Sequence, residues 1–419
     1  MLDVSRRVLL LTTPTSYRTA AFLTAAERLG IEVLLVEDTP EPLRQLWGQR
    51  YGVDFSRPER AVEALAELVQ SCPVRAVVPV DDAGTILAAA LSRRLGLPSN
   101  EPDAAVAARD KWIMRQRFAA ASVPSPQALA VPALSSPAHL ARGVTFPCVV
   151  KPTRLTGSRG VIRADDPASL ALAFERVRAI LASDGTRLED AVLLVEPFVP
   201  GFEVALEGML DNGTLVPLAL FDKPDPLDGP FFEETIYVTP SRLPSATQEA
   251  IRAVTERAAR ALGLHTGPVH AELRVNDAGV WVIEVAGRSI GGLCSRILEF
   301  GTGRSLEEII LAQAVGDPID SLQRRPDAVG VMMIPIPGRG IFRGVDGLEH
   351  ALRVPGIIGI ELTVRRNQLV LPLPEGASYL GFIFARGDDP RTVENALRTA
   401  HAHLRIRLVP DLPLQSTLR

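Results

Sequence analysis

Apolar and polar positions alternate in two different ways along the first hundred residues. Short runs of mainly apolar residues predict β-strands, and longer segments with an apolar residue at about every third or fourth position predict helices. The predicted strands are residues 8–13, 32–38 and 76–80, and the predicted helices are 19–30, 58–69 and one that ends at Gly96. Strands that alternate with helices in this way indicate a parallel α/β layer.

The pattern changes after a helical stretch at 102–121 and a Pro-rich joint at 123–127. Strand-like runs now come in pairs separated by tight turns, and Asp211-Asn212-Gly213 is typical of a hairpin turn. Further helices are predicted at 167–182, 246–262 and 305–315. This region is therefore predicted to be α+β with antiparallel sheets.

A third pattern begins after about residue 325. Its order is strand–helix–strand–strand–strand–helix–strand, which resembles a small split βαβ sheet. We therefore expect three domains. They are an N-terminal parallel α/β domain at 1–122, an α+β region at 123–325 and a split βαβ-like subdomain at 326–419.

Composition and charge restrict the function classes. The 419 residues suit two or three domains, and 47% hydrophobic with 22% charged residues is ordinary for a globular protein with a real core. A net charge of -4 and 5% aromatic residues give no basis for binding nucleic acid. The turn after the first strand, TTPTSYRT, lacks the G-x-G-x-x-G of a dinucleotide-binding turn, so a nicotinamide-dependent dehydrogenase is not expected.

The cysteines and the N-terminal segment indicate where the protein resides. Cys72, Cys148 and Cys294 are scattered without metal-site spacing, and an odd number suits a reducing compartment. The apolar run after Arg6-Arg7 is too short for a signal peptide, and no run approaches the roughly 18 apolar residues of a membrane span. We expect a cytoplasmic protein with no membrane partner.

Two glutamates lie in a predicted hairpin between residues 270 and 288. A three-residue loop at 277–279 would pair Asn276 with Val280, and counting outward would pair Glu272 with Glu284. Side-chain alternation then predicts one polar face and one core face. The polar face would hold His270, Glu272, Arg274, Val282, Glu284, Ala286 and Arg288, and the core face Leu273, Val275, Trp281, Ile283 and Val285.

Opposed carboxylates in a hairpin call for a positive charge between them. Like charges directly opposite each other destabilise a sheet, and a hard divalent cation such as Mg²⁺ with oxygen ligands would relieve the repulsion between Glu272 and Glu284. The plainer alternative is that Arg274 and Arg288 neutralise both carboxylates on a solvated face.

Two other segments are candidates for binding a nucleotide. The strand FPCVVK ends at Lys151 and continues into a loop with Gly157, Ser158 and Gly160, whose backbone N–H groups could wrap an anion. An ordinary hairpin turn with a solvated lysine is the alternative.

The second segment is the strand that ends in Glu196-Pro197-Phe198-Val199, with Glu203 seven residues after Glu196. Its proline suggests an edge strand or a break in pairing, which would leave backbone groups for the edge of an adenine. An edge strand with nothing bound is the alternative.

Substrate contacts are sought in residues 222–244, a segment rich in Pro and Gly and too irregular for a plain strand. We interpret it as a loop over an active site, with Glu234 as the partner of a substrate ammonium group. A surface hairpin is the alternative. The SIGG run, which contains Ser289, Gly291 and Gly292, could hold a carboxylate through backbone N–H groups. His270 faces the proposed metal, although a structural role is the commoner one for such a residue.

In chain order these motifs resemble the ATP-grasp carboxylate–amine ligases. The spacing of seven from Glu196 to Glu203 and of twelve from Glu272 to Glu284 both match that superfamily. The C-terminal run PLPEGASYLGFIFARG is similar to the final domain of L-amino-acid (dipeptide) ligases. The resemblance covers nearly the whole chain and is more specific for the superfamily than for the substrate.

The resemblance implies an ATP-grasp middle region at 123–325 and a set of site residues. Its nucleotide-binding residues would be Lys111, Lys151, Gly157, Ser158, Gly160, Glu196, Phe198, Val199 and Glu203. Glu203 would take the ribose hydroxyls, and the glycine-rich loop would cover the phosphates. Glu272 and Glu284 would hold Mg²⁺, and Arg288 would stabilise the transferred phosphoryl group.

One position departs from the superfamily pattern E-x-N-x-R. The chain has Ala286 where the asparagine often stands, and a methyl group cannot ligate a cation. Amino-acid ligases tolerate this loss, so it favours that branch and leaves open whether one or two Mg²⁺ ions bind. Mn²⁺ could replace Mg²⁺.

The resemblance implies an enzyme that uses ATP to activate a carboxylate, expected to be that of an amino acid, as an acyl phosphate. An amine would then displace phosphate to form an amide or dipeptide. Two alternatives stay open: a ligase for a non-amino-acid, purine or cofactor precursor, and an ATP-binding regulator without turnover. The partners would be small molecules, and a homodimer is compatible with the sequence.

Overall fold

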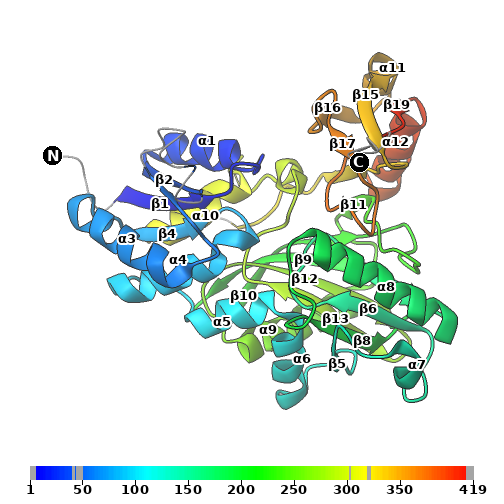
Figure 1. The fold of residues 1–419 in the computed structure, drawn as a ribbon. Helices are drawn as coiled ribbons and strands as arrows, with labels where there is room; N and C mark the ends of the chain where they lie inside the picture. The colour runs from blue at the N-terminus through cyan, green and yellow to red at the C-terminus, as the bar shows by residue number, and fades with distance from the viewer. Residues whose placement is uncertain (1–5, 40–42, 44–50, 302, 319–321, 412–419) are drawn as a thin grey trace, which may run out of the picture. The chain divides into compact units, whose positions relative to one another are not determined.

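The computed structural model describes residues 6–39, 43, 51–301, 303–318 and 322–411 (Figure 1). The chain forms two compact units. The first unit comprises residues 1–125, 204–220 and 243–326, and the second comprises 126–203, 221–242 and 327–419. The chain therefore passes between the units five times. The expected division into three consecutive domains, at 1–122, 123–325 and 326–419, stays a prediction.

The N-terminal part of the first unit confirms the predicted parallel α/β layer. Its sheet has the strand order β3-β2-β1-β4, and all neighbouring strands are parallel. The strands are β1 (Arg7–Thr12), β2 (Glu32–Asp38), β3 (Gly52–Val53) and β4 (Ala76–Pro79), and the helices between them are α1 (Thr19–Leu29), α3 (Pro58–Ser71) and α4 (Asp82–Leu95). Leu9 and Leu11 of β1 are fully buried against α3 and α4, as expected of a strand covered on both faces.

The helical stretch predicted at 102–121 is interrupted. Helix α5 (Pro102–Arg109) ends and α6 (Lys111–Ala120) begins around Asp110, whose backbone is extended. The Asp110 carboxylate accepts hydrogen bonds from the backbone N–H groups of Trp112 and Ile113 and so caps α6. The break places Lys111 at the first position of α6.

The rest of the first unit contains an antiparallel section of sheet with the strand order β13-β12-β9-β10. Its elements are β9 (Phe202–Asp211), β10 (Thr214–Asp222), α9 (Ser245–Leu262), β12 (Gly267–Asn276), β13 (Gly279–Ala286), the 3-10 helix η2 (Cys294–Ile297) and α10 (Leu306–Val315). The first two residues of β9 and the last two of β10 belong to the second unit. The hairpin predicted at 211–213 is confirmed, and Asn212 and Gly213 both adopt positive φ.

The second unit begins with an antiparallel sheet of order β5-β8-β6-β7. Its elements are β5 (Leu129–Pro132), α7 (Pro137–Leu140), β6 (Cys148–Pro152), β7 (Ile162–Ala164), α8 (Pro167–Ser183) and β8 (Val192–Pro197). Helix α8 covers this sheet through an apolar face that includes Leu170, Phe174 and Val177. The antiparallel sheets predicted for this region are confirmed.

The C-terminal part of the second unit has the predicted order of elements and one additional strand, β15. The elements are β14 (Ala328–Ile334), β15 (Gly340–Asp346), α11 (Leu348–Leu352), β16 (Ile357–Leu362), β17 (Leu369–Val370), β18 (Gly381–Gly387), α12 (Pro390–Ala402) and β19 (Arg405–Val409). Strand β11 (Ile236–Thr239), from the segment 221–242 of the same unit, pairs with β14. Together they supply the consecutive strands β11-β14-β18-β16 of a larger sheet and all three strands of a second sheet, of order β17-β15-β19. Strand β15 contains Gly344 at positive φ and a register shift, which is why its alternation of apolar residues is weak.

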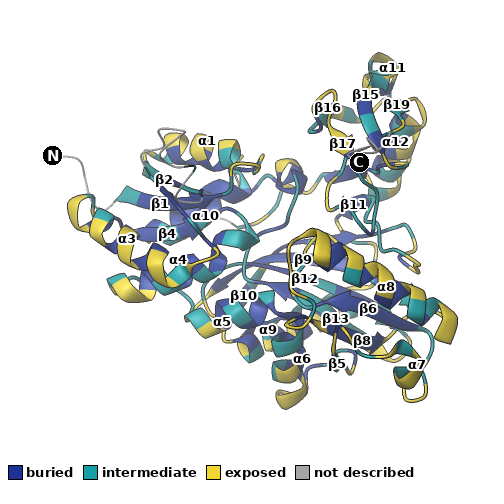
Figure 2. Ribbon diagram, in the orientation of Figure 1, coloured by how far each residue is buried: buried dark blue, intermediate teal, exposed yellow. Residues whose placement is uncertain are grey.

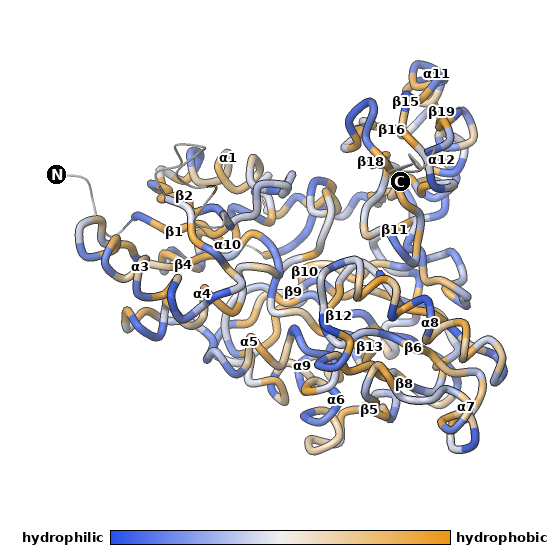
Figure 3. The backbone as a smooth tube through the Cα atoms, in the orientation of Figure 1, coloured by the Kyte–Doolittle hydropathy of each residue, from blue (hydrophilic) through white to orange (hydrophobic). Residues whose placement is uncertain are grey.

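Burial follows the amphipathic pattern of the sequence. Helices α3 and α8 expose one side and bury the other (Figure 2). Polar and apolar positions alternate along α8 in the same way (Figure 3). Among the described residues, no helix is both long enough and apolar enough to cross a membrane.

Candidate active site

The two glutamates of the β12–β13 hairpin lie directly opposite each other. Glu272 of β12 pairs with Glu284 of β13, as the sequence predicts. Both side chains are partly exposed, to 25% and 30%. Paired residues of an antiparallel ladder share a face, so the two carboxylates are neighbours.

The hairpin reaches this pairing by a different route from the predicted one. The turn has two residues rather than three, because Asn276 pairs with Gly279 and not with Val280. The register then shifts between Glu272 and Leu273, and Ile283 is the additional residue on β13. The two one-residue differences cancel at Glu284.

The shift corrects the predicted faces of β13. Val282 pairs with Leu273 and both are fully buried, so Val282 belongs to the core face and not to the face of the glutamates. Trp281 pairs with Arg274 and therefore does not share the core face of Leu273. A pattern of strict alternation cannot reveal the inserted residue that causes both errors.

A lysine on helix α6 supplies the positive charge beside Glu284. The Lys111 ammonium group lies 3.1 Å from a Glu284 carboxylate oxygen, and the Lys111 side chain is buried. On the neighbouring strand, the Nε2 atom of His270 lies 3.8 Å from Glu272. The alternative was that Arg274 and Arg288 neutralise both glutamates. Arg288 does interact electrostatically with Glu284, but its hydrogen bonds go to Asp82 and to the Ser289 carbonyl.

Arg288 is held by a residue that sequence analysis missed. Its Nε atom donates to the Asp82 carboxylate at 2.9 Å, and its Nη1 atom donates to the Ser289 carbonyl oxygen at 2.9 Å. Burial by itself would raise the pKa of Asp82, but the Arg288 charge and hydrogen bond lower it below the usual value. Burial would likewise lower the pKa of Arg288, and Asp82 raises it. Arg288 is thus a permanent cation in a fixed orientation.

A second missed residue, Glu207, lies fully buried beneath the site. One of its oxygens is 3.1 Å from Nδ1 of His270 and accepts the backbone N–H of Ile290 at 2.9 Å. Burial raises the pKa of Glu207 despite these hydrogen bonds. His270 has a raised pKa because Glu207 and Glu272 outweigh its own burial. The detectable signal was a charged residue inside the apolar run FEVALEGML.

The SIGG run is anchored at both of its first two residues after Arg288. Arg18 donates to the Ser289 hydroxyl at 2.5 Å and to the Val80 carbonyl oxygen at 2.8 Å, and Glu207 takes the Ile290 amide. Gly292 has a φ of 64°, and a Cβ at Gly291 would meet no atom within 4 Å. The role of Ser289, Gly291 and Gly292 in holding a carboxylate stays a prediction.

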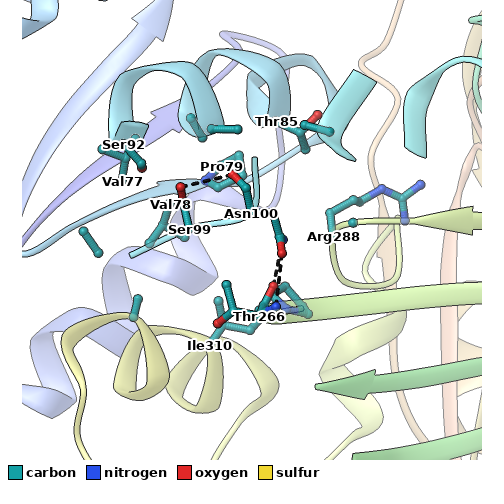
Figure 4. Close-up of a pocket in the computed structure, with 18 of the residues that line it drawn as sticks. Val77, Val78, Pro79, Thr85, Ser92, Ser99, Asn100, Thr266, Arg288 and Ile310 are labelled. Carbon is teal, nitrogen blue, oxygen red and sulfur yellow. Dashed lines mark hydrogen bonds between the residues drawn. The ribbon is translucent and has the colours of Figure 1, made fainter. Parts of the chain in front are cut away.

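A cavity of about 160 Å³ lies in the first unit, next to the backbone of Arg288 (Figure 4). Small apolar residues from β4, α4 and α5 form part of its wall. Asn100 lies on one side of the cavity. Its side-chain Nδ2 donates to the Thr266 carbonyl oxygen, and its Oδ1 accepts the backbone N–H groups of His265 and Thr266. Figure 4 shows the Arg288 side chain leading away from Asn100, so its guanidinium is directed away from this wall of the cavity.

The second unit carries the residues expected to bind the nucleotide. Lys151 and Glu196 lie on the adjacent strands β6 and β8 and form a buried ion pair of 2.7 Å. Strand β8 lies between β5 and β6, so the prediction of an edge strand is wrong. Pairing with β5 ends at Val195, whereas pairing with β6 continues to Pro197. The proline therefore lies where pairing with β5 has ended, which is the break in pairing that the sequence suggested as the alternative to an edge strand.

The glycine-rich loop joins β6 to β7 and has an unusual backbone. Gly157, Ser158 and Gly160 have φ angles of 62°, 56° and 70°. Ser158 is the only one of the three that pays a steric cost for this left-handed conformation. Successive turns of this kind are typical of anion-binding loops.

Glu203 and Glu234 share one lysine that sequence analysis missed. The Lys223 ammonium group lies 2.9 Å from Glu203 and also hydrogen-bonds to Glu234, which accepts a hydrogen bond from the Tyr237 hydroxyl at 2.8 Å. Glu234 was expected to bind a substrate ammonium, and in the structure it binds an ammonium of its own chain. Lys223 carried no recognisable signal, because it lies in the irregular segment 222–244.

A pocket of about 910 Å³ in the second unit opens beside this cluster. Glu203, Lys223 and Phe198 line it, and the Arg163 guanidinium lies over the Phe198 ring at 4.4 Å from its centre. An open pocket with a carboxylate, an ammonium group and an aromatic face has the donors, acceptors and stacking surface that a nucleoside requires.

Three segments of the chain match models of described domains. A model described as "ATP-grasp domain" matches residues 144–297, "L-amino acid ligase C-terminal domain 2" matches 332–409, and "ATP-grasp N-terminal domain" matches 23–99. The crystal structure of L-amino acid ligase from Bacillus licheniformis superposes with a TM-score of 0.81 at 26% identity, and covers 97% of this chain and 100% of that one.

Two curated proteins with named activities are also similar. Dapdiamide A synthase of Enterobacter agglomerans is 28% identical over 350 residues, which is 80% of each chain. Alanine–anticapsin ligase of Bacillus subtilis is 28% identical over 261 residues, which is 57% of this chain and 53% of that protein.

Proposed function

We propose that this chain, which matches the ATP-grasp and L-amino acid ligase domain models, is a carboxylate–amine ligase. It would join the carboxylate of one amino acid to the amine of another and convert ATP to ADP and phosphate. The observation that carries this proposal is the pairing of Glu272 with Glu284 in a face-to-face register. Lys111 and His270 offset part of the repulsion between the two carboxylates, and the paired oxygen donors that remain favour a function in metal-assisted phosphoryl transfer.

The reaction has two steps that balance without a redox partner. A carboxylate oxygen attacks the γ-phosphorus of ATP, the bond to the bridging oxygen breaks, and acyl phosphate and ADP form. The amine nitrogen of the second substrate then attacks the acyl carbon and forms the C–N bond. The bond from the acyl carbon to the phosphate oxygen breaks, phosphate leaves with that oxygen, and the nitrogen loses a proton. Water must be excluded between the steps because it would hydrolyse the acyl phosphate.

We assign the metal to the hairpin carboxylates. Glu272 and Glu284 offer the oxygen donors that Mg²⁺ prefers, and Ala286 offers none. When bound there, Mg²⁺ would neutralise charge on the transferred phosphoryl oxygens. This donor set supports one ion more strongly than two. Lys111, now paired with Glu284, is the nearby cation that can turn to phosphate.

We assign the nucleotide to the second unit. Lys151 and the loop with Gly157, Ser158 and Gly160 would contact phosphates. The main chain from Glu196 through Phe198 to Val199 would meet the adenine edge, and the Glu203 carboxylate would accept the ribose hydroxyls. Support comes from the buried Lys151–Glu196 pair, which keeps this strand end rigid, and from the open pocket beside Glu203.

We assign substrate recognition to charged groups of both signs. Glu234, already bonded to an ammonium, suits the amino group of an amino acid. Arg288 and the backbone at Ser289, Gly291 and Gly292 suit a carboxylate or the oxyanion that replaces it. His270 lies beneath Glu272 and is assigned to orienting that side chain rather than to the substrate.

A pairwise matrix of amino acids tests the proposal. Each pair is incubated with the purified chain, ATP and Mg²⁺, phosphate release is measured, and the product of each positive pair is identified by mass spectrometry. We expect phosphate only with particular pairs, and a product whose mass is the sum of the two amino acids less one water. ATP that binds in calorimetry but yields no ADP with any pair would refute the proposal and favour a regulator.

A further inference from the structure

The glycine-rich loop of the second unit rests on a segment from the C-terminal part of the same unit. The backbone N–H of Gly160 donates to the Pro374 carbonyl oxygen at 3.0 Å. Nε of Arg159 donates to the Glu375 carbonyl oxygen at 2.7 Å. A Cβ built at Gly157 would lie 3.5 Å from the Ala377 carbonyl oxygen. The backbone of residues 374–377 thus forms the floor of the loop.

One ion pair fixes this floor. Both carboxylate oxygens of Glu375 accept hydrogen bonds from Arg176 of α8, at 2.6 Å and 3.0 Å. Hydrogen bonding to Arg176 is the main reason that the pKa of Glu375 is lowered. Two parallel hydrogen bonds define the position of a carboxylate far better than one, so the main chain at 374–377 is set by α8.

Arg176 also touches the segment proposed to cover the substrate. Its guanidinium lies over the Phe231 ring at 4.7 Å from the ring centre. Phe231 pairs with Ile162, the residue that begins β7 directly after the glycine-rich loop. Arg163 donates its backbone N–H to Pro230 at 2.9 Å. The Arg176 guanidinium therefore contacts both the floor and the substrate segment, and Phe231 joins the substrate segment to the strand that follows the glycine-rich loop.

We propose that Arg176 and Glu375 are positioning residues that hold the glycine-rich loop over the transferred phosphoryl group and so couple ATP use to amide formation. This inference rests on the proposed ligase function. Neither residue touches a reacting atom. They act through the backbone of residues 374–377, which sets the position of the loop.

The exposure of the pair separates this role from a purely structural one. The Arg176 and Glu375 side chains are 43% and 36% exposed, and solvent screens ion pairs at such positions, so the pair adds little to the stability of the fold. Loop position is more sensitive, because a displacement of about 1 Å at a reacting centre can cost about a hundredfold in rate. Removing the pair should therefore leave folding intact and damage the coupling.

The test compares wild type with Glu375→Gln and Arg176→Gln. The matched control is Arg187→Gln, which removes the ion pair of Arg187 with Asp190 in the second unit. This pair is 3.3 Å long and far more exposed than that of Arg176 with Glu375. The readouts are the melting temperature, the hydrogen exchange of amides 156–161 without substrates, and the ratio of ADP released to amide formed. Hydrogen exchange reports on the loop whatever reaction the enzyme performs.

We expect both variants to keep the wild-type melting temperature, to exchange the loop amides faster, and to release at least about threefold more ADP per amide because the acyl phosphate meets water. The double variant should be no worse than either single variant, since the two residues form one unit. Unchanged exchange and an unchanged ratio in both single variants, or effects that simply add in the double variant, would overturn the inference. A wild type that makes no amide with any pair refutes the ligase function instead, and the exchange data still decide on the role of the pair.

Discussion

Replacing Glu272 with glutamine tests whether this carboxylate serves to bind a metal or to stabilise the fold. Opposed residues have Cβ atoms about 5 Å apart, and two unit charges at that distance repel by about 3 kcal/mol at an effective dielectric constant of about 20. Glu272 is 25% exposed, and Lys111 lies 3.1 Å from Glu284, so solvent and this lysine cancel part of the repulsion. We expect the variant to gain about 1 kcal/mol in free energy of unfolding without Mg²⁺.

Turnover should move in the opposite direction. Glutamine has nearly the same shape and can still offer one oxygen, but it lacks the charge that attracts a divalent cation. We expect a loss of about a hundredfold to a thousandfold in Mg²⁺-dependent ADP formation, the range seen when one charge-stabilising group is removed from a phosphoryl- or acyl-transfer site. A variant that gains stability and loses activity indicates that the residue is unfavourable for the fold and is needed for function.

The assay needs two measurements and one control. The melting temperature is measured by calorimetry with and without Mg²⁺ and ATP, and ADP release is followed with a positive amino-acid pair. For a chain of this length about 1 kcal/mol corresponds to an increase of about 1–2 °C. Asp277→Asn removes an exposed carboxylate from the turn of the same hairpin and should change neither quantity. A melting temperature several degrees lower, or full turnover in Glu272→Gln, would show that the reasoning about the metal is wrong.

Three further changes test the frame around the site. Asp82→Asn should cost about 1–2 kcal/mol at neutral pH. Burial alone would raise the pKa of Asp82 but its arginine partner lowers it, so the difference in melting temperature from wild type should hold above about pH 4 and shrink as the pH falls further. Gly160→Ala should lower the denaturation midpoint more than Gly157→Ala. Both residues have a left-handed φ, which costs alanine about 1 kcal/mol. Only a Cβ at residue 160 would also lie 3.2 Å from a carbon of Pro152. Asn100→Ala should cost about 2 kcal/mol in thermal unfolding, because its amide makes three hydrogen bonds to the backbone of residues 265 and 266.

The parts of the fold that follow from local pattern were predictable. The parallel layer, the hairpin at 211–213 and the helices of the middle region come from side-chain periodicity and turn chemistry that a short window contains. The break at Asp110 was not expected, because a capping carboxylate and a solvated one look alike until the helix start is known. Strand β15 was missed for a similar reason, since its glycines and charges hide the alternation.

The β12–β13 hairpin shows how a correct contact can rest on an incorrect path. The pair Glu272–Glu284 was predicted, yet its derivation used a turn one residue too long and a ladder one residue too regular. Turn length depends on local backbone energetics, whereas the extra residue at Ile283 lies where Val282 enters the core opposite Leu273. Only the second is a tertiary property, and no sequence window contains it.

The supporting residues of the site were beyond prediction because their partners are remote in the chain. Asp82 and Arg288 are 206 positions apart, and Glu207 reaches Ile290 across 83 positions. Sequence motifs reveal groups that act together within one element. They do not reveal which distant carboxylate will orient a given arginine, since that depends on which helices the folded chain brings together.

Three of the proposed ligand-binding sites already contain a lysine of the chain itself. The pairs are Lys111–Glu284, Lys151–Glu196 and Lys223 with both Glu203 and Glu234. A ligand that uses one of these carboxylates must therefore exchange one ion pair for another rather than fill an unsatisfied charge. The free-energy cost of removing these charged groups from water is already included in the folded state. The free energies of the two ion pairs are therefore nearly equal, and small differences in geometry decide which pair forms. Selectivity for a substrate ammonium at Glu234 should then depend on how readily Lys223 moves, and not on the carboxylate alone.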